Sequence, residues 1–254
     1  MRAILVSILA TLAACNSSGG TSDMGAGMDL TTTATVTERG TVIDLSSKNP
    51  VANLQVCLYS PMLSPQPCAT TGADGTYSLP GIPASTQVAA SLTGGAYYPS
   101  LYLKTTGAAD ETNDIEAISS GTITLLTAVV NVQADPTKGQ IAVIALDGNP
   151  PPDGGTGPAH NSGISVALTP SSGSGPFYLD ATGIPQMVNK QSMTSAKGVG
   201  AYINVDPGVV ELTYTAPAGI TCAAPIAGWP GSTPSSIKAL VVAGYGTAAY
   251  MTCK

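Results

Sequence analysis

Apolar and polar residues alternate along most of the chain from residue 34 onward, a pattern typical of half-buried β-strands. The first stretches of this kind cover residues 34–45 and 54–59, with a polar turn at 47–50 between them. Further strands are predicted at 87–92 and at 97–103, the second as an irregular edge strand. The positions expected to face a core in the first stretches are Val36, Thr41 to Ile43, Leu54, Val56 and Leu58.

A turn signal lies at the centre of this region. Asp74 and Gly75 separate two strand-like runs, and Asp-Gly favours a tight hairpin because glycine adopts positive φ at little cost. A related pattern returns at 194–214, where Lys197 and Gly198 occupy the turn. The chain therefore reads as two copies of one β unit.

The second copy supplies its own series of predicted strands. They cover residues 139–147, 163–168, 177–179, 200–205, 209–215, 237–243 and 247–253. The insert at 148–162 is mostly Gly, Pro, Asp and Asn, which predicts an exposed loop.

An apolar run at 122–132 lies between the two copies. Its length fits either a short buried helix or a strand that completes the first unit. The Asp135-Pro136 pair that follows favours the helix, because it is typical of a helix stop.

Composition agrees with an all-β fold and narrows the classes of partner. Only 9% of the 254 residues are charged, and 29 glycines and 20 prolines accompany many Thr, Ser and Val residues. The formal net charge is −6, and the nine Lys and Arg residues are scattered singly. Since a phosphate backbone requires a basic surface, nucleic acid is not an expected partner.

The N-terminus reads as an export signal. Met1 and Arg2 precede an apolar run, residues 3–14, that is too short to span a bilayer comfortably. The run ends in Leu-Ala-Ala-Cys, which resembles the bacterial lipobox. This resemblance implies that Cys15 is diacylated, with palmitate among the acyl chains, and becomes the first residue of the mature protein. Asn16 at the next position resembles the outer-membrane class of lipoproteins, and an ordinary secretory signal is the alternative.

The four remaining cysteines predict two disulfide bonds and an oxidising compartment. Cys57 and Cys68 both fall in the first unit, and Cys222 and Cys253 both fall in the second. Pairing within each unit is the economical choice among three possible connectivities. No C-x-x-C spacing occurs and the chain has a single histidine, so a zinc site is not expected. No cofactor is predicted.

Several motifs of the first unit together resemble a known domain family. The segments are Gly40 to Asp44, Val56 to Leu58, Thr71 to Leu79 and Gly81 to Ala84. They look like the carboxypeptidase regulatory-like, transthyretin-like domain, over about residues 34–106. The resemblance implies a Greek-key β-sandwich without catalytic residues.

Candidate ligand-binding residues are few. Tyr97, Tyr98 and Tyr102 offer a surface for stacking sugars or for binding a protein, although half-buried strand aromatics explain them more simply. The single histidine, His160, lies in the Gly- and Pro-rich loop, where a catalytic triad would lack rigid support. Neither a catalytic residue nor a metal site is predicted.

The sequence thus predicts a lipid-anchored envelope protein that is exported to the outer membrane or cell surface and is not an enzyme. Its fold is expected to be two tandem transthyretin-like Greek-key β-sandwiches. A structural or binding module is the first interpretation, and an accessory domain for carbohydrate or a partner protein is the second. The expected parts are a signal peptide (1–14), a flexible tether (15–33), a first sandwich (34–108), a connector (109–138) and a second sandwich (139–254).

Overall fold

The protein is described from a computed structural model that covers residues 34–148, 161–188, 190–223 and 231–254. The expected signal peptide and tether, with Cys15, lie outside these residues, as do His160 and most of the loop predicted at 148–162. The part of the chain that the structure describes is almost entirely β, which confirms the predicted fold class.

The strands of the N-terminal half follow the predicted alternation closely. They are β1 (Thr35–Asp44), β2 (Gln55–Ser60), β3 (Cys68–Thr70), β4 (Thr76–Pro83), β5 (Gln87–Thr93), β6 (Ser100–Thr105), β7 (Glu111–Thr112) and β8 (Ile115–Ala117). A turn is present at Asp74-Gly75, where Gly75 has a φ of 75°, but the hairpin expected there is wrong. The flanking strands lie in different sheets, because β3 pairs with β2 and β4 pairs with β1.

The C-terminal half contributes a second set of strands after a single described helix, α1 (Ser120–Val129). These strands are β9 (Gly139–Asp147), β10 (Ser165–Thr169), β11 (Ser174–Tyr178), β12 (Val199–Val205), β13 (Gly208–Thr215), β14 (Cys222–Ala223), β15 (Ser236–Val241) and β16 (Gly246–Cys253).

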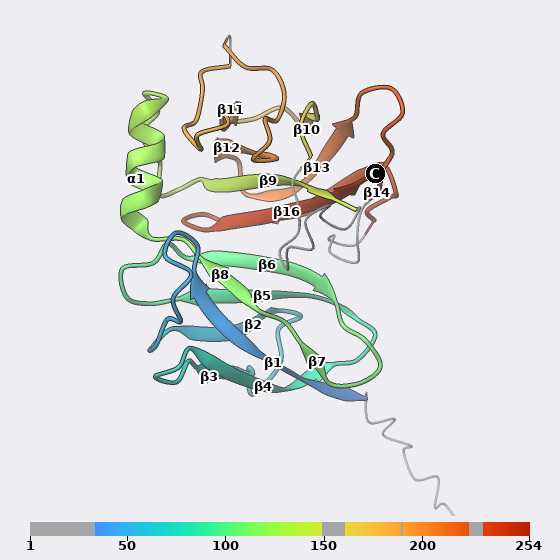
Figure 1. The fold of residues 1–254 in the computed structure, drawn as a ribbon. Coiled ribbons are helices and arrows are strands. Elements are labelled where there is room, and N and C mark those ends of the chain that lie inside the picture. The colour runs from blue at the N-terminus through green and yellow to red at the C-terminus, as the bar shows by residue number, and fades with distance from the viewer. Residues whose placement is uncertain (1–33, 149–160, 189, 224–230) are drawn as a thin grey trace, which may run out of the picture. The chain divides into compact units, whose positions relative to one another are not determined.

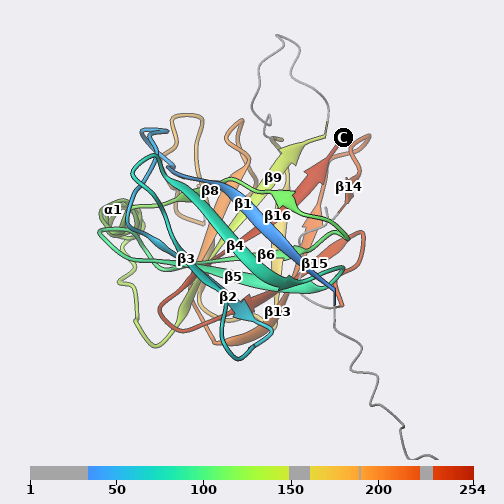
Figure 2. The same cartoon turned by 90° about the horizontal axis from the view of Figure 1, so that it is seen from below.

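Two small sheets and one long sheet are formed. The small N-terminal sheet has the order β4-β1-β7, with β8 also pairing with β1, and it faces the viewer in Figure 2. The small C-terminal sheet has the order β10-β13-β15. The long sheet runs β11-β12-β9-β16-β6-β5-β2-β3 and therefore takes strands from both halves. Figure 1 shows β9, β16, β6 and β5 one below another.

The long sheet passes from one half to the other at β16. This strand pairs in parallel with β9 along its whole length, from Gly246 opposite Gln140 to Cys253 opposite Asp147. Its first residues also pair in parallel with β6, where Gly246 lies opposite Ser100. The expectation that residues 97–103 form an edge strand is therefore wrong, because β16 covers that edge of β6.

The two hydrophobic cores lie on opposite faces of the long sheet where β5 and β6 run. Successive side chains of a strand point to opposite faces. Val88 belongs to the N-terminal core and the next residue, Ala89, to the C-terminal core. On β6, Tyr102 packs against the N-terminal core and Leu103 belongs to the C-terminal core. Each small sheet thus closes one sandwich, and the sandwiches share strands.

The N-terminal sandwich extends further along the chain than residue 108. Parallel pairing with β1 brings in β7 and β8, both within the expected connector. Ile115, opposite Val42 on β1, and Ala117, opposite Asp44, are both buried in the N-terminal core.

The predicted helix is present but shorter and more exposed than expected. Ser119 caps it by accepting a hydrogen bond from the Thr122 amide over 3.0 Å, which the preference for serine at this position explains. The helix ends at Val129, and Asn131 follows with a φ of 54°. It is not a buried helix, since Leu125 is 65% exposed.

Close packing between β11 and β12 gives a test of the C-terminal core. A Cβ on Gly200 would lie 2.7 Å from Cδ1 of the buried Tyr178 ring, whose hydroxyl accepts a hydrogen bond from the Val166 amide. We expect Gly200→Ala to lower the free energy of unfolding by about 1–3 kcal/mol, because overpacking forces the ring from its position. Urea unfolding measures this change.

Gly121→Ala is the matched control, because a Cβ on Gly121 would have no neighbour closer than 3.9 Å. A helical alanine should leave stability unchanged or raise it by up to about 1 kcal/mol. Equal unfolding midpoints for Gly200→Ala and the wild type would contradict the packing described for Tyr178.

Candidate functional site

Both predicted disulfide bonds are present. Cys57 and Cys68 are directly opposite each other on β2 and β3, with Cα atoms 4.1 Å apart, so the bond closes the proline-rich segment between the two strands. Cys222 and Cys253 are likewise opposite each other on β14 and β16, with Cα atoms 4.0 Å apart.

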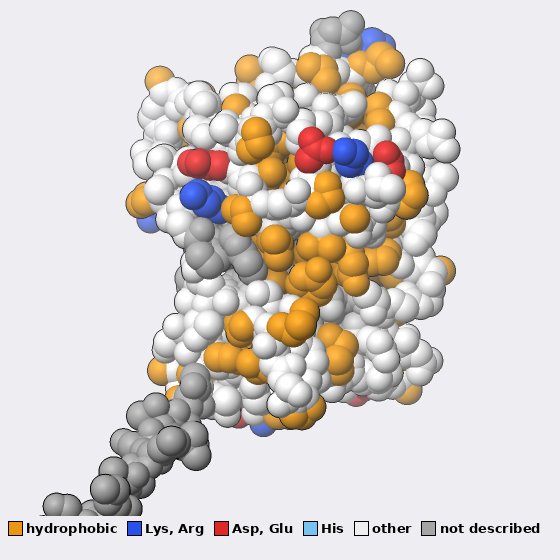
Figure 3. Space-filling view, turned by 180° about the vertical axis from the view of Figure 1, so that it is seen from behind, with side chains coloured by type: hydrophobic (Ala, Val, Ile, Leu, Met, Phe, Trp, Pro, Cys, Tyr) orange, Lys and Arg blue, Asp and Glu red, His pale blue; other side chains and the backbone are white. Residues whose placement is uncertain are grey.

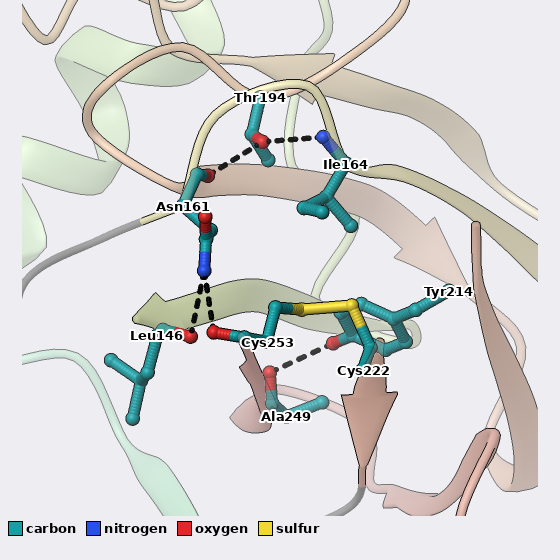
Figure 4. The surroundings of a disulfide bond; sticks show 8 residues. All are labelled: Leu146, Asn161, Ile164, Thr194, Tyr214, Cys222, Ala249 and Cys253. Atoms are coloured by element: carbon teal, nitrogen blue, oxygen red, sulfur yellow. Dashed lines mark hydrogen bonds between the residues drawn. A yellow bond between two sulfur atoms is a disulfide. The ribbon is translucent and has the colours of Figure 1, made fainter. Parts of the chain in front are cut away.

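The second disulfide lies among hydrogen bonds that join distant segments (Figure 4). Nδ2 of Asn161 donates to the carbonyl oxygen of Cys253 over 2.6 Å. The carbonyl oxygen of Asn161 in turn accepts from the Thr194 hydroxyl over 2.8 Å, and that hydroxyl accepts from the Ile164 amide. Tyr214 donates to the carbonyl oxygen of Ala249 over 3.0 Å. The end of β16 is therefore held by side chains as well as by its sheet partners.

The three tyrosines singled out in the sequence are half-buried. Tyr97 and Tyr102 pack against the N-terminal core. The Tyr102 hydroxyl donates to the carbonyl oxygen of Glu116 over 2.5 Å, and burial raises the pKa of this phenol. Tyr98 lies beside Gly246, at the start of β16. These side chains therefore take part in packing, and their binding of a ligand stays a prediction.

A buried polar cluster is the most distinctive arrangement of functional groups. Its centre is Glu38 on β1, whose side chain is 2% exposed between the small N-terminal sheet and the long sheet. Oε1 of Glu38 accepts a hydrogen bond from Nδ2 of Asn113 over 2.8 Å. The Tyr77 hydroxyl lies 3.0 Å from the same oxygen and 2.7 Å from the carbonyl oxygen of Asn113. Three segments of the chain therefore meet at one carboxyl group.

A lysine enters this cluster from the long sheet. Nζ of Lys104, on β6, lies 3.2 Å from Oε2 of Glu38 and 2.6 Å from Oε2 of Glu111. The lysine side chain is 15% exposed, whereas the Glu111 side chain is 27% exposed. Strand alternation explains its direction, because Lys104 shares a face of β6 with Tyr102, which packs against the N-terminal core.

Oε2 of Glu38 has no hydrogen-bond partner among the residues that the structure describes, although the Lys104 ammonium is within ion-pair distance. A buried polar atom without a hydrogen bond costs free energy, and such atoms are few in native proteins. Among the described residues, this oxygen therefore depends on the Lys104 ammonium to compensate its charge.

The neighbours of Glu38 differ in their protonation. Burial, followed by the nearby negative charge of Glu38, raises the pKa of Tyr77, so this phenol is a neutral hydrogen-bond donor. Burial acts to raise the pKa of Glu111 as well. Hydrogen bonds from Lys104 and from the Gly107 amide outweigh it, and the pKa of Glu111 lies below its usual range.

A glycine permits the close approach of Asn113 to β1. The Asn113 amide donates to the carbonyl oxygen of Arg39 over 2.7 Å. A Cβ on Gly40 would collide with the carbonyl oxygen of Asn113, so this position on β1 requires glycine.

Sequence reasoning did not select any member of the cluster. Strand alternation offers one local signal. Glu38 is an even number of positions from Val36 and Val42 on β1, so its side chain points to the same face, toward the core. The partners gave no such signal, since Asn113 is 75 positions from Glu38.

Other functional groups do not gather in the described ranges. Across residues 34–148, 161–188, 190–223 and 231–254, no three His, Cys, Asp or Glu side chains are placed to hold a metal ion. Within the same ranges, no helix is both long enough and apolar enough to cross a bilayer.

Comparisons with known proteins identify no family for this chain. Neither a family model nor a curated protein matches it. Among solved structures, the TIE protein of Bacillus anthracis matches with a TM-score of 0.28 and 11% identity over 86% of this chain, which spans 34% of that protein's length.

Two pilins of Gram-positive bacteria also match. The minor pilin GBS52 of Streptococcus agalactiae has a TM-score of 0.29 and 9% identity, over 86% of this chain and 95% of the pilin. The shaft pilin SpaA of Lactobacillus rhamnosus GG has a TM-score of 0.24 and 10% identity, over 88% and 98%. These TM-scores are too low for the likenesses to carry an argument about function.

Each disulfide should stabilise the fold by an amount that grows with the logarithm of the loop length that it closes. Paired Cys→Ser substitution at 57 and 68, which are 11 positions apart, should lower the free energy of unfolding by about 3 kcal/mol. The same change at 222 and 253, which are 31 positions apart, should cost about 4 kcal/mol in the chain-entropy model. Urea unfolding checks both values. Unchanged midpoints, or peptide maps with pairs between the two halves, would contradict the assignment.

Proposed function

We propose that this protein is exported, is anchored to the bacterial envelope by lipid at Cys15, and serves there as a non-enzymatic structural or binding module. The observation that carries the proposal is the way in which the cysteines pair. Every cysteine downstream of Cys15 is in a disulfide bond, within an all-β fold. Such bonds form and persist in oxidising compartments. Cys15 is then the single cysteine without a disulfide role, and it ends an apolar N-terminal run.

The anchor follows from this arrangement. A thioether-linked diacylglycerol has two acyl chains, and two lipid chains suffice for stable attachment to a bilayer. Asn16, which follows Cys15, supports the outer membrane as the destination. The N-terminal unit, with its resemblance to the carboxypeptidase regulatory-like domain, would act as a compact stalk or platform at the surface.

The described surface suits such a module. Figure 3 shows a face on which charged side chains are few, with apolar side chains running across its middle. Low charge agrees with the 9% of charged residues in the sequence. Exposed apolar side chains favour contact with other envelope components. A surface with few positive charges does not favour binding of a polyanion.

An accessory domain that binds a partner protein is the second candidate. Four large apolar side chains between β11 and β12 are exposed to solvent. Monomeric proteins rarely expose large apolar patches, so such side chains can mark a binding surface. They are Ile184 (50% exposed), Met187 (42%), Val188 (48%) and Met193 (47%).

The lipid anchor is tested by Cys15→Ser. We expect the wild-type protein to partition with membranes and to incorporate labelled palmitate, and the variant to do neither. Circular dichroism should show the same β content for both proteins, because neither disulfide uses Cys15. Wild-type protein recovered without lipid, in the soluble fraction, would contradict the proposal.

The partner-binding alternative is tested by crosslinking in intact cells. The double substitution Met187→Ser, Val188→Ser should remove a crosslinked species that the wild-type protein forms, since it takes away apolar contact area. Met62→Ser is the matched control, because Met62 is 89% exposed in the N-terminal half. An unchanged crosslinking pattern in the double variant would count against this surface.

A further inference from the structure

We propose that the buried cluster around Glu38 is a self-modification site, at which Lys104 and Asn113 become joined by an amide bond between their side chains. The inference rests on one juxtaposition. The two oxygens of a single buried carboxyl group contact an amine, which is a nucleophile when it is deprotonated, and a carboxamide, which is an electrophile.

The reaction is an exchange of amines that needs no oxidant, metal or cofactor. Nζ of Lys104 forms a bond with Cγ of Asn113, and the bond from Cγ to Nδ2 breaks. An ammonium side chain and a carboxamide become a secondary amide and an ammonium ion, so atoms and charge balance. Glu38 begins and ends as a carboxylate.

Glu38 is positioned to accept a proton from Lys104 and to donate one to the departing nitrogen of Asn113. Its Oε2 lies 3.2 Å from Nζ of Lys104 and has no hydrogen-bond partner among the described residues, so it is free to accept the ammonium proton. Its Oε1 lies 2.8 Å from Nδ2 of Asn113 and can return a proton to the departing nitrogen. Glu38 is therefore a catalytic residue of this reaction, acting as a base and then as an acid.

The surroundings of Glu38 hold the reacting groups in position. The Glu38 side chain is 2% exposed and that of Lys104 is 15% exposed, so little water reaches the carboxyl group and the amine. A product formed beside them would be shielded from hydrolysis. Tyr77 fixes one oxygen of Glu38 and the backbone of Asn113 in a single orientation.

Asn113 is a better electrophile than the other carbonyl group beside Lys104. Glu111 has a lowered pKa and is a carboxylate, whose negative charge repels a nucleophile. The carboxamide of Asn113 is neutral, and its nitrogen can leave once it is protonated. Attack requires Nζ to turn from Glu111 toward Asn113, until nitrogen and carbon are about 3–3.5 Å apart.

The product would link β6 of the long sheet to the residue after β7 of the small N-terminal sheet. The two layers of the N-terminal sandwich, otherwise held together by packing and hydrogen bonds, would then be joined covalently beside their core.

Mass spectrometry of the purified full-length protein tests the proposal. Trypsin does not cleave after an acylated lysine, so digestion should give one peptide, 49–138, lighter than its sequence by one ammonia, in place of peptides 49–104 and 105–138. Fragmentation should give no backbone ions between residues 104 and 113. Wild-type peptides of unmodified mass, with normal cleavage after Lys104, would overturn the proposal without any variant.

Variants test the roles of the residues. Glu38→Gln, Lys104→Arg and Asn113→Ala should each retain the full mass, and circular dichroism shows whether each has folded. Lys138→Arg is the control, because Lys138 pairs with Asp206 at an exposed site, and this variant should lose ammonia as the wild type does. Loss of one water in place of ammonia would move the bond to a carboxyl group and overturn the assignment to Asn113. A crosslink in folded Glu38→Gln would overturn the role of Glu38.

Discussion

Backbone pairing of β16 with strands of both halves is the constraint on which the arrangement of the sandwiches depends. β9 lies along one edge of this strand, and β6 and β14 share the other. The same strand carries Cys253, which is buried in the C-terminal core and bonded to Cys222. Since β5 and β6 contribute side chains to cores on both of their faces, moving β16 would disturb the two sandwiches together.

Local sequence was sufficient for most of the strands, because alternation is a local property. Val56 and Leu58 identify β2, and the run from Gly139 to Asp147 identifies β9 with its bounds. Strand order is not local. Nothing in residues 97–103 tells that β16, far along the chain, will pair with them. The predicted edge strand became an interior one for that reason.

The disulfides could likewise be predicted from local sequence, whereas the polar cluster depends on non-local strand order. Containment of two cysteines in each unit was enough to predict both bonds, since each pair lies on strands of the same half. The cluster depends on parallel pairing of β1 with β7 and on the direction of Lys104 across the sandwich. Parity could have shown that Glu38 points inward, but its partners are fixed by topology. A buried charge in an otherwise apolar strand face is the signal to look for.

The position of β16 has a consequence for how the chain is made. Synthesis delivers a polypeptide from its N-terminus, so β6 emerges well before the strand that covers its edge. Until β16 appears, the unpaired amides and carbonyl groups of β6 could accept a strand from another molecule. A chain that stops before β16 leaves that edge open permanently. Completion of the long sheet thus requires that translation has passed β16, and shorter products keep an open strand edge that proteases and chaperones can detect.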